Sequence, residues 1–452
     1  MKNQAIKVYS NTLRLKFLTE KFNQVKFYSV VIGAIVILFS SCSVSKQISK
    51  KANNILLKDS AISSGHIGIS IYEPATDRYW YNYDATKYFV PASNTKLFSL
   101  YAGMKYLGDS LVGVRYEIDK DSLVHIQPTG DPTFLHPEFL NQPVYAFLKG
   151  SKWISFTNRS FTDNFMGMGW AWDDYTSSYM VQRSNFPIYG NLINIKKAGN
   201  GVTVTPTSQP YLIPENTNLQ NGFEVKKKWD DNLITIIAGT NQRLFVPFTP
   251  HSPDIIEMLK DTLHLPVIPG PDQTKPFKKI IHSQPSDSLF KPMMHRSDNF
   301  YAEQTLLMAS NEHLGFMNDE KMIDTILNND LKDIPQRPKW VDGSGLSRYN
   351  LFTPQSFVYI LNKLKNEFGL ERLKNILPTG GEGTLSAYYK KDAGFIFAKT
   401  GTLSNQCALS GFIITKKNKL LIFSVLNNHY KTSATPVRKA VEKFLQDIRE
   451  KY

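Results

Sequence analysis

Cysteine is scarce in this 452-residue chain, which contains only Cys42 and Cys407. A fold held together by several disulfide bonds is excluded, so its stability must come from a hydrophobic core. The nine histidines show no H-E-x-x-H motif or paired spacing of metal ligands, and we therefore expect no metal site and no cofactor. Cys407 is most simply explained as a small apolar residue buried in a strand.

Acidic residues are outnumbered, with 39 Asp and Glu against 53 Lys and Arg, which gives a formal net charge of +14. Such a charge favours anionic surroundings, for example nucleic acid, acidic polymers or lipid head groups. No zinc-knuckle, RNP-like or helix-turn-helix pattern accompanies it, so we expect no nucleic-acid partner and interpret the excess lysines as a solvated surface. The composition, 42% hydrophobic and 20% charged, is that of a globular protein, and the length allows more than one folding unit.

A long hydrophobic run is also missing, since the apolar run at residues 27–39 has thirteen residues against the ~20 that a membrane-spanning helix needs. Six basic residues precede it within residues 1–26, and Ser40 and Ser41 lead into Cys42. This arrangement is typical of a lipoprotein-type export signal over residues 1–42, in which Cys42 is lipidated. The alternative is an uncleaved membrane anchor. Both predict a place in the bacterial cell envelope, on the periplasmic side, with the membrane as a partner.

The pattern of apolar residues predicts a fold of the α/β class, in its α+β form. Alternation predicts a β-hairpin at residues 67–83, and helical spacing begins at Ser93 and again at Asn299. Near the C-terminus, strands are predicted at residues 395–398, 408–414 and 420–427, with a helix at 435–449. Two strands from the beginning and three from the end together predict one sheet built by both ends of the chain.

The middle of the chain is predicted to be an insertion. Residues 109–275 carry β-like stretches and end in a Pro- and Gly-rich segment at residues 266–271. We interpret them as a β-rich inserted domain within a core made of residues 66–108 and 276–452. Residues 43–65 are expected to be a linker.

Three short polar motifs occur in order along the chain: Ser93-Asn94-Thr95-Lys96, Ser297-Asp298-Asn299 and Lys399-Thr400-Gly401. S-x-x-K by itself is a weak signal, because it recurs at residues 43–46 and 288–291, and an isolated serine at a helix start more often binds free backbone amides. The ordered set of three is informative. It contains the parts of a serine acyl-transfer site that uses lysine where serine proteases use histidine.

Each motif has an expected chemical role. Ser93 is the candidate nucleophile, and Lys96, one helical turn later, can take its proton only when neutral. Because a free lysine titrates near ~10.4, burial and a second cation such as Lys399 would have to lower its pKa. Ser297 is expected to pass the proton to the leaving amine, and Asn299 to hydrogen-bond the substrate amide.

The third motif is expected to bind the substrate's terminal carboxylate. Lys399, Thr400 and Thr402 would hold that carboxylate, and Gly401 and Leu403 are further candidate substrate-binding residues. Backbone N–H groups of Ser93 and Thr402 would form an oxyanion hole, where loss of one donor typically costs ~2.7–4 kcal/mol.

Further segments extend this pattern: Pro91 to Lys96, Gly130 to Thr133, Gly169 to Asp174, Ser297 to Glu303, Asp342 to Arg348, Gly383 to Leu385 and Lys399 to Leu403. Together they resemble the D-alanyl-D-alanine carboxypeptidases and endopeptidases, the class C low-molecular-mass penicillin-binding proteins, over about residues 66–430. The resemblance implies a transpeptidase/β-lactamase-like core with a central five-stranded antiparallel sheet flanked by helices. It also implies a serine-type D-Ala-D-Ala carboxypeptidase, with or without DD-endopeptidase activity, that acts on peptidoglycan stem peptides and is inhibited covalently by β-lactams.

The resemblance further implies an aspartate and an arginine that hold the free end of diaminopimelate. Asp131 and Arg348 stand at positions that look like the matching ones, although Gly-Asp-Pro is also an ordinary turn and Arg348 has a structural alternative. The gap from Lys96 to Ser297, 297 − 96 = 201 residues, agrees with an inserted domain and argues against a class A β-lactamase. Two alternatives stay open: a serine β-lactamase, and a catalytically silent lipoprotein that binds peptidoglycan.

Overall fold

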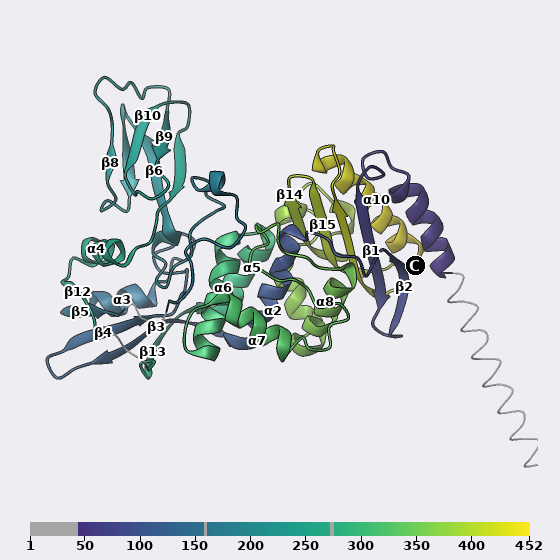
Figure 1. Ribbon diagram of the computed structural model, residues 1–452, viewed down its shortest axis with the longest axis horizontal. Helices are drawn as coiled ribbons and strands as arrows, with labels where there is room; N and C mark the ends of the chain where they lie inside the picture. Colours follow the sequence, from purple (N-terminus) through teal and green to yellow (C-terminus); the bar gives the residue numbers. More distant parts are fainter. Residues whose placement is uncertain (1–43, 158–160, 272–274) are drawn as a thin grey trace, which may run out of the picture.

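The computed structural model describes residues 44–157, 161–271 and 275–452 (Figure 1). The predicted export signal, with Cys42, lies outside the described residues. Within the described ranges, every helix is too short or too polar to span a lipid bilayer.

A five-stranded antiparallel sheet forms the centre of the catalytic part, which confirms the predicted fold class. Its strand order is β14 (Ile396–Leu403), β15 (Gln406–Ile414), β16 (Leu420–Asn428), β1 (His66–Glu73) and β2 (Arg78–Tyr83). The central strand β16 is apolar almost throughout because it is covered on both faces. Leu421 and Phe423 belong to one hydrophobic core, and Ile422 and Leu426 to the other.

One face of the sheet is covered by both ends of the described chain. The C-terminal helix α10 (Ala434–Lys451) packs there beside helical residues 44–52 and the π-helical turn Asn53–Leu57 (Figure 1). Ile48 and Leu56 are buried in this layer, and Lys51 Nζ lies 2.6 Å from an Asp447 carboxylate oxygen. The expectation of a linker at residues 43–65 is therefore wrong, because apolar residues of this segment complete the core.

The other face is covered by helices that carry two of the three motifs. Apolar side chains of α2, α6 and α8 meet those of the sheet in one continuous core. Asp298 begins α6 by accepting a hydrogen bond from the Tyr301 N–H, and Gly315 ends it in a left-handed conformation. The helices are α2 (Lys96–Tyr106), α5 (Ser286–His295), α6 (Asn299–Leu314), α7 (Asp319–Asn328), α8 (Pro354–Phe368) and α9 (Leu370–Ile376).

The inserted region is built on a second five-stranded sheet, of order β12, β5, β4, β3, β13. Its last strand, β13, follows the expected end of the insertion at residue 275, yet it pairs with β3 along one edge. The insertion therefore extends to Pro285, and the chain re-enters the catalytic part at α5. The bounds are β3 (Ser110–Ile118), β4 (Leu123–Pro128), β5 (Trp153–Phe156), β12 (Val267–Pro269) and β13 (Lys279–Pro285).

Two three-stranded sheets and two α-helices complete the described part of the insertion, which lies at the opposite end of the molecule from α10 (Figure 1). One sheet has the order β11, β6, β7 and the other β8, β10, β9, consistent with the predicted β-rich character. The elements are α3 (Pro143–Lys149), β6 (Leu192–Ala198), β7 (Gly201–Thr205), β8 (Tyr211–Leu212), β9 (Phe223–Lys227), β10 (Ile234–Ala238), β11 (Arg243–Pro247) and α4 (Ser252–Leu263).

One segment of the insertion, residues 161–185, runs back across the catalytic helices. The Thr162 N–H donates to the Met317 carbonyl at 3.1 Å, and the Ser184 N–H donates to the Gln304 side chain at 3.1 Å. Since Gln304 lies on α6, the insertion is attached directly to the helix that follows the second motif.

Candidate active site

The first motif lies where a short 3₁₀ helix, Ala92–Thr95, leads into α2. Ala92, directly before the candidate nucleophile, has φ of +47°, a left-handed conformation that is rare for residues other than glycine. The three-residue step then places the Ser93 Oγ 3.0 Å from the Lys96 Nζ. Backbone strain of this kind persists only where the surrounding structure imposes it, and it is concentrated at functional sites.

The Lys96 amine has three hydrogen-bond partners. Besides Ser93, its Nζ contacts the Asn299 Oδ1 at 2.6 Å and the Ser344 carbonyl at 2.7 Å. The last two are oxygens that can only accept, whereas a serine hydroxyl can donate or accept. A neutral Lys96 would therefore donate its two protons to Asn299 and Ser344 and direct its lone pair toward the Ser93 hydroxyl.

Burial makes a neutral Lys96 accessible. The residue is fully buried, and this burial lowers the pKa of the amine to about 8, while the carboxylates of Asp342, Glu303 and Asp298 act in the opposite direction. The sequence-based expectation named burial and Lys399 as the causes. Burial is the largest contribution, and the charges that act next on this pKa are those of the three carboxylates and not that of Lys399.

The second motif faces the first from the start of α6. Ser297 has φ of +64° and accepts a hydrogen bond from the Lys399 Nζ at 2.8 Å. Asn299 bridges two elements: its Oδ1 accepts from Lys96, and its Nδ2 donates to the Tyr179 carbonyl at 2.8 Å. Asn299 thus orients Lys96 and anchors the inserted segment.

The third motif lies inside strand β14, which continues through it to Leu403 rather than ending at Lys399 as predicted. Lys399 is buried, and burial together with the charges of Lys96 and Arg438 holds its pKa well below the ordinary value. Gly401 permits a close approach, because a Cβ there would lie 2.6 Å from the Pro91 carbonyl oxygen. The Asn94 Nδ2 also donates to the Lys399 carbonyl at 2.9 Å, which fixes β14 against the first motif.

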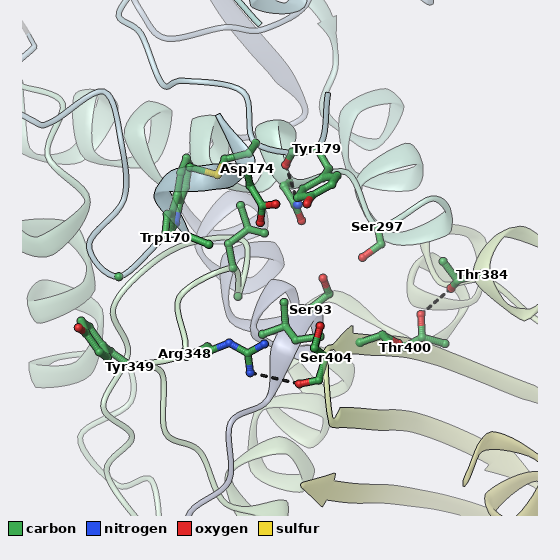
Figure 2. A pocket seen from close by; sticks show the side chains of 18 of the residues that line it. Ser93, Trp170, Asp174, Tyr179, Ser297, Arg348, Tyr349, Thr384, Thr400 and Ser404 are labelled. Carbon is green, nitrogen blue, oxygen red and sulfur yellow. Dashed lines mark hydrogen bonds between the residues drawn. The ribbon is translucent and has the colours of Figure 1, made fainter. Parts of the chain in front are cut away.

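These residues surround a cleft of about 790 Å³ (Figure 2). The structure brings seven of the predicted residues to its lining: Ser93, Ser297, Asn299, Arg348, Thr400, Thr402 and Leu403. Lys96 and Lys399 lie directly behind Ser93 and Ser297, buried from solvent. The hydroxyl groups of Ser93 and Ser297 therefore form one wall of the cleft, and a buried lysine lies behind each of them.

Arg348 and Asp131, which the sequence paired, lie in different places. Arg348 lines the cleft and donates to the Ser404 carbonyl at 3.2 Å. Asp131 is buried after strand β4 and is absent from the described residues that line the cleft; its carboxylate accepts from the N–H and hydroxyl of Thr133, both at 3.0 Å. This geometry is that of a carboxylate that closes the Gly-Asp-Pro turn, the alternative noted from the sequence.

Trp170, Asp174, Tyr179 and Arg438 are among the cleft residues that the sequence did not identify as site residues. Trp170, Asp174 and Tyr179 come from the inserted segment and face Ser93 and Ser297 across the cleft (Figure 2). A signal was present for Trp170 and Asp174, since residues 169–174 are one of the segments that carry the family resemblance. Arg438, on α10, lines the cleft and donates to the Thr402 Oγ1 at 2.5 Å; a single arginine in an amphipathic helix gave no such signal.

The sequence model of the D-Ala-D-Ala carboxypeptidase 3 (S13) family matches residues 48–242 and 271–448 of this chain. The chain belongs to this family. The enzyme class, a serine-type D-Ala-D-Ala carboxypeptidase, agrees with the class predicted from the motifs.

Individual relatives of this S13 chain are distant but match over most of their length. The D-alanyl-D-alanine carboxypeptidase DacB of Haemophilus influenzae is 24% identical over 405 residues, which cover 78% of this chain and 83% of the relative. A D-alanyl-D-alanine carboxypeptidase of Actinomadura is 22% identical over 448 residues, 82% of this chain and 79% of the relative. The crystal structure of penicillin binding protein 4 from H. influenzae superposes with a TM-score of 0.70 at 20% identity, covering 89% of this chain and 99% of the other, which shows a shared fold.

The pKa of Lys96 predicts the pH dependence of serine acylation. If the neutral amine is the base, the rate of covalent labelling by a fluorescent penicillin should rise about tenfold per pH unit below 8 and level off above it. The sign follows from the lowered pKa, because the active form is the deprotonated one. Stopped-flow labelling between pH 6 and 9.5 measures this, with Lys96→Ala as the control that should be slow at every pH. A flat profile in the parent protein would contradict the role of Lys96.

Proposed function

We propose that this S13 carboxypeptidase cleaves the terminal D-Ala-D-Ala bond of peptidoglycan stem peptides through an acyl intermediate on Ser93. The observation that carries the proposal is the Ser93 Oγ at 3.0 Å from the Lys96 Nζ, whose two other contacts are both obligate acceptors. A serine hydroxyl is a poor nucleophile without a base, and this arrangement supplies one inside a buried site.

Acylation follows from the contacts around the two serines. Neutral Lys96 takes the Ser93 proton while Oγ attacks the carbonyl carbon of the penultimate D-Ala. The backbone N–H groups of Ser93 and Thr402 hold the developing oxyanion. As the C–N bond breaks, Ser297, hydrogen-bonded to Lys399, relays the proton that Lys96 took to the nitrogen of the departing D-Ala, which leaves Lys96 neutral again. Water then hydrolyses the acyl-Ser93 ester, with Lys96 again acting as the base.

The terminal carboxylate of the substrate is bound at strand β14. Thr400 and Thr402 present hydroxyl groups to the cleft, and Arg438 adds a guanidinium beside Thr402. The Lys399 amine is engaged by Ser297 and by the Thr400 carbonyl at 2.7 Å, so it acts on the carboxylate mainly through its electrostatic field. Gly401 and Leu403 shape the strand along which the peptide lies.

The far wall of the cleft suits a side chain that carries both charges. Asp174 and Arg348 line the same cleft on elements from different parts of the chain (Figure 2). A carboxylate pairs with an ammonium, and a guanidinium binds a carboxylate with a matched fork of donors. We assign the free end of diaminopimelate to this pair, with Asp174 in the position that the sequence had suggested for Asp131.

The covalent step is tested with Ser93→Ala. The parent protein should form a long-lived adduct with fluorescent penicillin, visible after denaturing electrophoresis, and Ser93→Ala should form none because the attacking oxygen is gone. Ser404→Ala, which also lines the cleft, is the matched control and should label. An unlabelled parent would overturn the proposal, whereas rapid release of hydrolysed penicillin would identify a β-lactamase instead.

The recognition of diaminopimelate is tested with Asp174→Asn. This change should lower kcat/KM for a diaminopimelyl stem peptide by one to two orders of magnitude, the roughly 1.5–3 kcal/mol of a charge-assisted hydrogen bond. Acylation by benzylpenicillin, which lacks the zwitterionic group, should change less than twofold. Asp131→Asn serves as the comparison and should not distinguish the two compounds. Equal losses on both compounds in Asp174→Asn would exclude this role.

The same proposal includes attachment to the envelope through Cys42. A site on the periplasmic side gives the enzyme access to peptidoglycan, and the described core begins close after the cysteine, since residues 44–52 are helical and packed against α10. A lipidated Cys42 would therefore hold the catalytic core near the membrane.

Lipidation is tested by expressing the full chain and Cys42→Ser with radiolabelled palmitate. The parent should incorporate label and enter the detergent phase, and Cys42→Ser should do neither. Cys407→Ser is the control and should behave like the parent, because Cys407 is buried in β15. Equal incorporation into the parent and Cys42→Ser would contradict lipidation at this residue.

A further inference from the structure

Behind the cleft lies a buried cluster of charges that the catalytic steps above do not use. Arg183, from the inserted segment, is surrounded by the carboxylates of Asp163, Glu303 and Asp319. The side chains of Arg183 and Glu303 are 2% and 0% exposed, and those of Asp163 and Asp319 are 6% and 9% exposed. The Arg183 guanidinium lies 3.1 Å from the Asp163 carboxylate and 3.5 Å from the Glu303 carboxylate, and it donates a hydrogen bond to Asp319. Buried charges of this kind are costly unless they are paired.

Glu303 connects this cluster to the catalytic amine through a single residue. One carboxylate oxygen of Glu303 accepts the Ser344 N–H at 2.7 Å, and the Ser344 carbonyl accepts from the Lys96 Nζ at 2.7 Å. The other carboxylate oxygen of Glu303 is buried without a hydrogen bond and faces Arg183. Glu303 therefore fixes Ser344, the residue whose carbonyl holds Lys96, and brings a negative charge close to the amine.

The charges in this region do not balance. Four buried carboxyl groups, of Asp163, Glu303, Asp319 and Asp342, accompany the two cations Arg183 and Lys96. Burial and the neighbouring carboxylates raise the pKa of Glu303 to about 8, against the lowering effect of Arg183. The pKa of Asp319 is raised in the same way, to about 7. Neutral forms of these groups are therefore accessible near the pH at which the enzyme must work.

We propose that Glu303 is a positioning residue that sets the protonation state of Lys96, and that Arg183 ties this control to the inserted domain. When Glu303 is ionised, its charge favours the ammonium form of Lys96, which cannot accept the Ser93 proton. When Glu303 is neutral, the free amine is favoured. Two groups that interact in this way titrate as a pair, each with an apparent pKa that depends on the other.

The inserted segment is linked to the same pair from the cleft side. The Trp170 indole lines the cleft, donates its N–H to Asp342 at 2.9 Å, and has the Arg183 guanidinium 5.9 Å from its ring centre. Asp342 in turn accepts the N–H of Gly345 at 2.8 Å, in the loop that contains Ser344. A substrate that contacts Trp170 would thus be separated by this one side chain from Asp342, whose charge acts on Lys96, and from Arg183, whose charge acts on Glu303.

The test is Glu303→Gln, which removes the charge but keeps an oxygen that can accept from the Ser344 N–H. Loss of a nearby negative charge favours the neutral amine and lowers the pKa of Lys96. The pH profile of acylation by fluorescent penicillin should therefore reach its plateau at a pH lower by roughly half a unit, while the two profiles should converge at pH 6.5, where Glu303 is protonated in the parent. Rates are normalised to the fraction of protein that labels at completion, which removes losses due to misfolding.

Asp319→Asn is the matched control. It removes the same charge from the same arginine, but Asp319 does not contact Ser344, and Asp342, Glu303 and Asp298 are the carboxylates that act on the pKa of Lys96. Its profile should not shift downward, because loss of the Asp319 charge favours ionised Glu303, which in turn favours the ammonium form of Lys96. An unshifted profile in Glu303→Gln would overturn the inference, because a merely structural role would change only the stability or the plateau rate. Equal shifts in both variants would overturn it as well.

A second measurement covers the case in which Glu303→Gln does not fold. In the parent protein labelled with carbon-13 at the glutamate side-chain carboxyls, one glutamate should titrate near pH 8, and this titration should move upward in Lys96→Ala, where a cation is lost. Titration of every glutamate below pH 6 would overturn the inference. The inference rests on the proposed role of Lys96 as base, and the two fail separately: a parent protein without any penicillin adduct contradicts the proposed function itself, whereas labelling with an unshifted profile contradicts the role of Glu303 alone.

Discussion

The catalytic part of the molecule depends on the burial of one amine. Lys96 lies in the interior with its hydrogen-bonding positions assigned to Ser93, Asn299 and Ser344, which belong to three separate elements. Burying an amine is costly in free energy, and that cost is what lowers the pKa of Lys96. The energy that the sheet and helices gain by burying apolar surface therefore supports an arrangement that would be unfavourable by itself.

The edge strand β14 shows the same coupling between packing and chemistry. Its first residues belong to the apolar core, and its continuation places Lys399 behind Ser297 and presents two threonine hydroxyls to the cleft. Gly401 lets this strand lie against the Pro91 carbonyl, so that nucleophile and carboxylate-binding strand are held at a fixed separation. An edge strand suits this purpose because one side of its backbone is free of a neighbouring strand.

The inserted domain is part of the site as well as an addition to it. Residues 161–185 pack on α6 and supply Trp170, Asp174 and Tyr179 to the cleft, while Arg183 enters the buried cluster beside Glu303. A wall contributed by a different folding unit allows the specificity of the cleft to vary without change to the serine and lysine positions. The buried charges near Arg183 also hold the inserted domain in one position, since a displaced arginine would leave three carboxyl groups without their cation.

The amino-acid sequence by itself determined the class of chemistry and much of the fold. The ordered motifs predicted Ser93, Lys96, Ser297, Asn299 and Lys399 as site residues, because residue types and local spacing are visible in the sequence, and the structure brings these residues together. The alternation of apolar residues in the hairpin at residues 67–83 and the helical spacing after Ser93 predicted strands of the sheet and the helices, since each pattern reflects a local backbone period. Local patterns could not show that residues 44–57 complete the core, that β13 belongs to the insertion, or that Asp174 and not Asp131 faces the cleft.

Those points were decided by the tertiary structure, because they depend on contacts between residues far apart in the chain. Arg438 reaches Thr402 from a helix whose sequence shows only amphipathic spacing. Glu303 acts on Lys96 through Ser344, which follows Glu303 by 41 residues in the sequence. The pKa of Lys96 is likewise a property of burial, which no spacing of residues specifies. The sequence named the groups that react, and the packing of the chain set their distances, their charges and the wall they face.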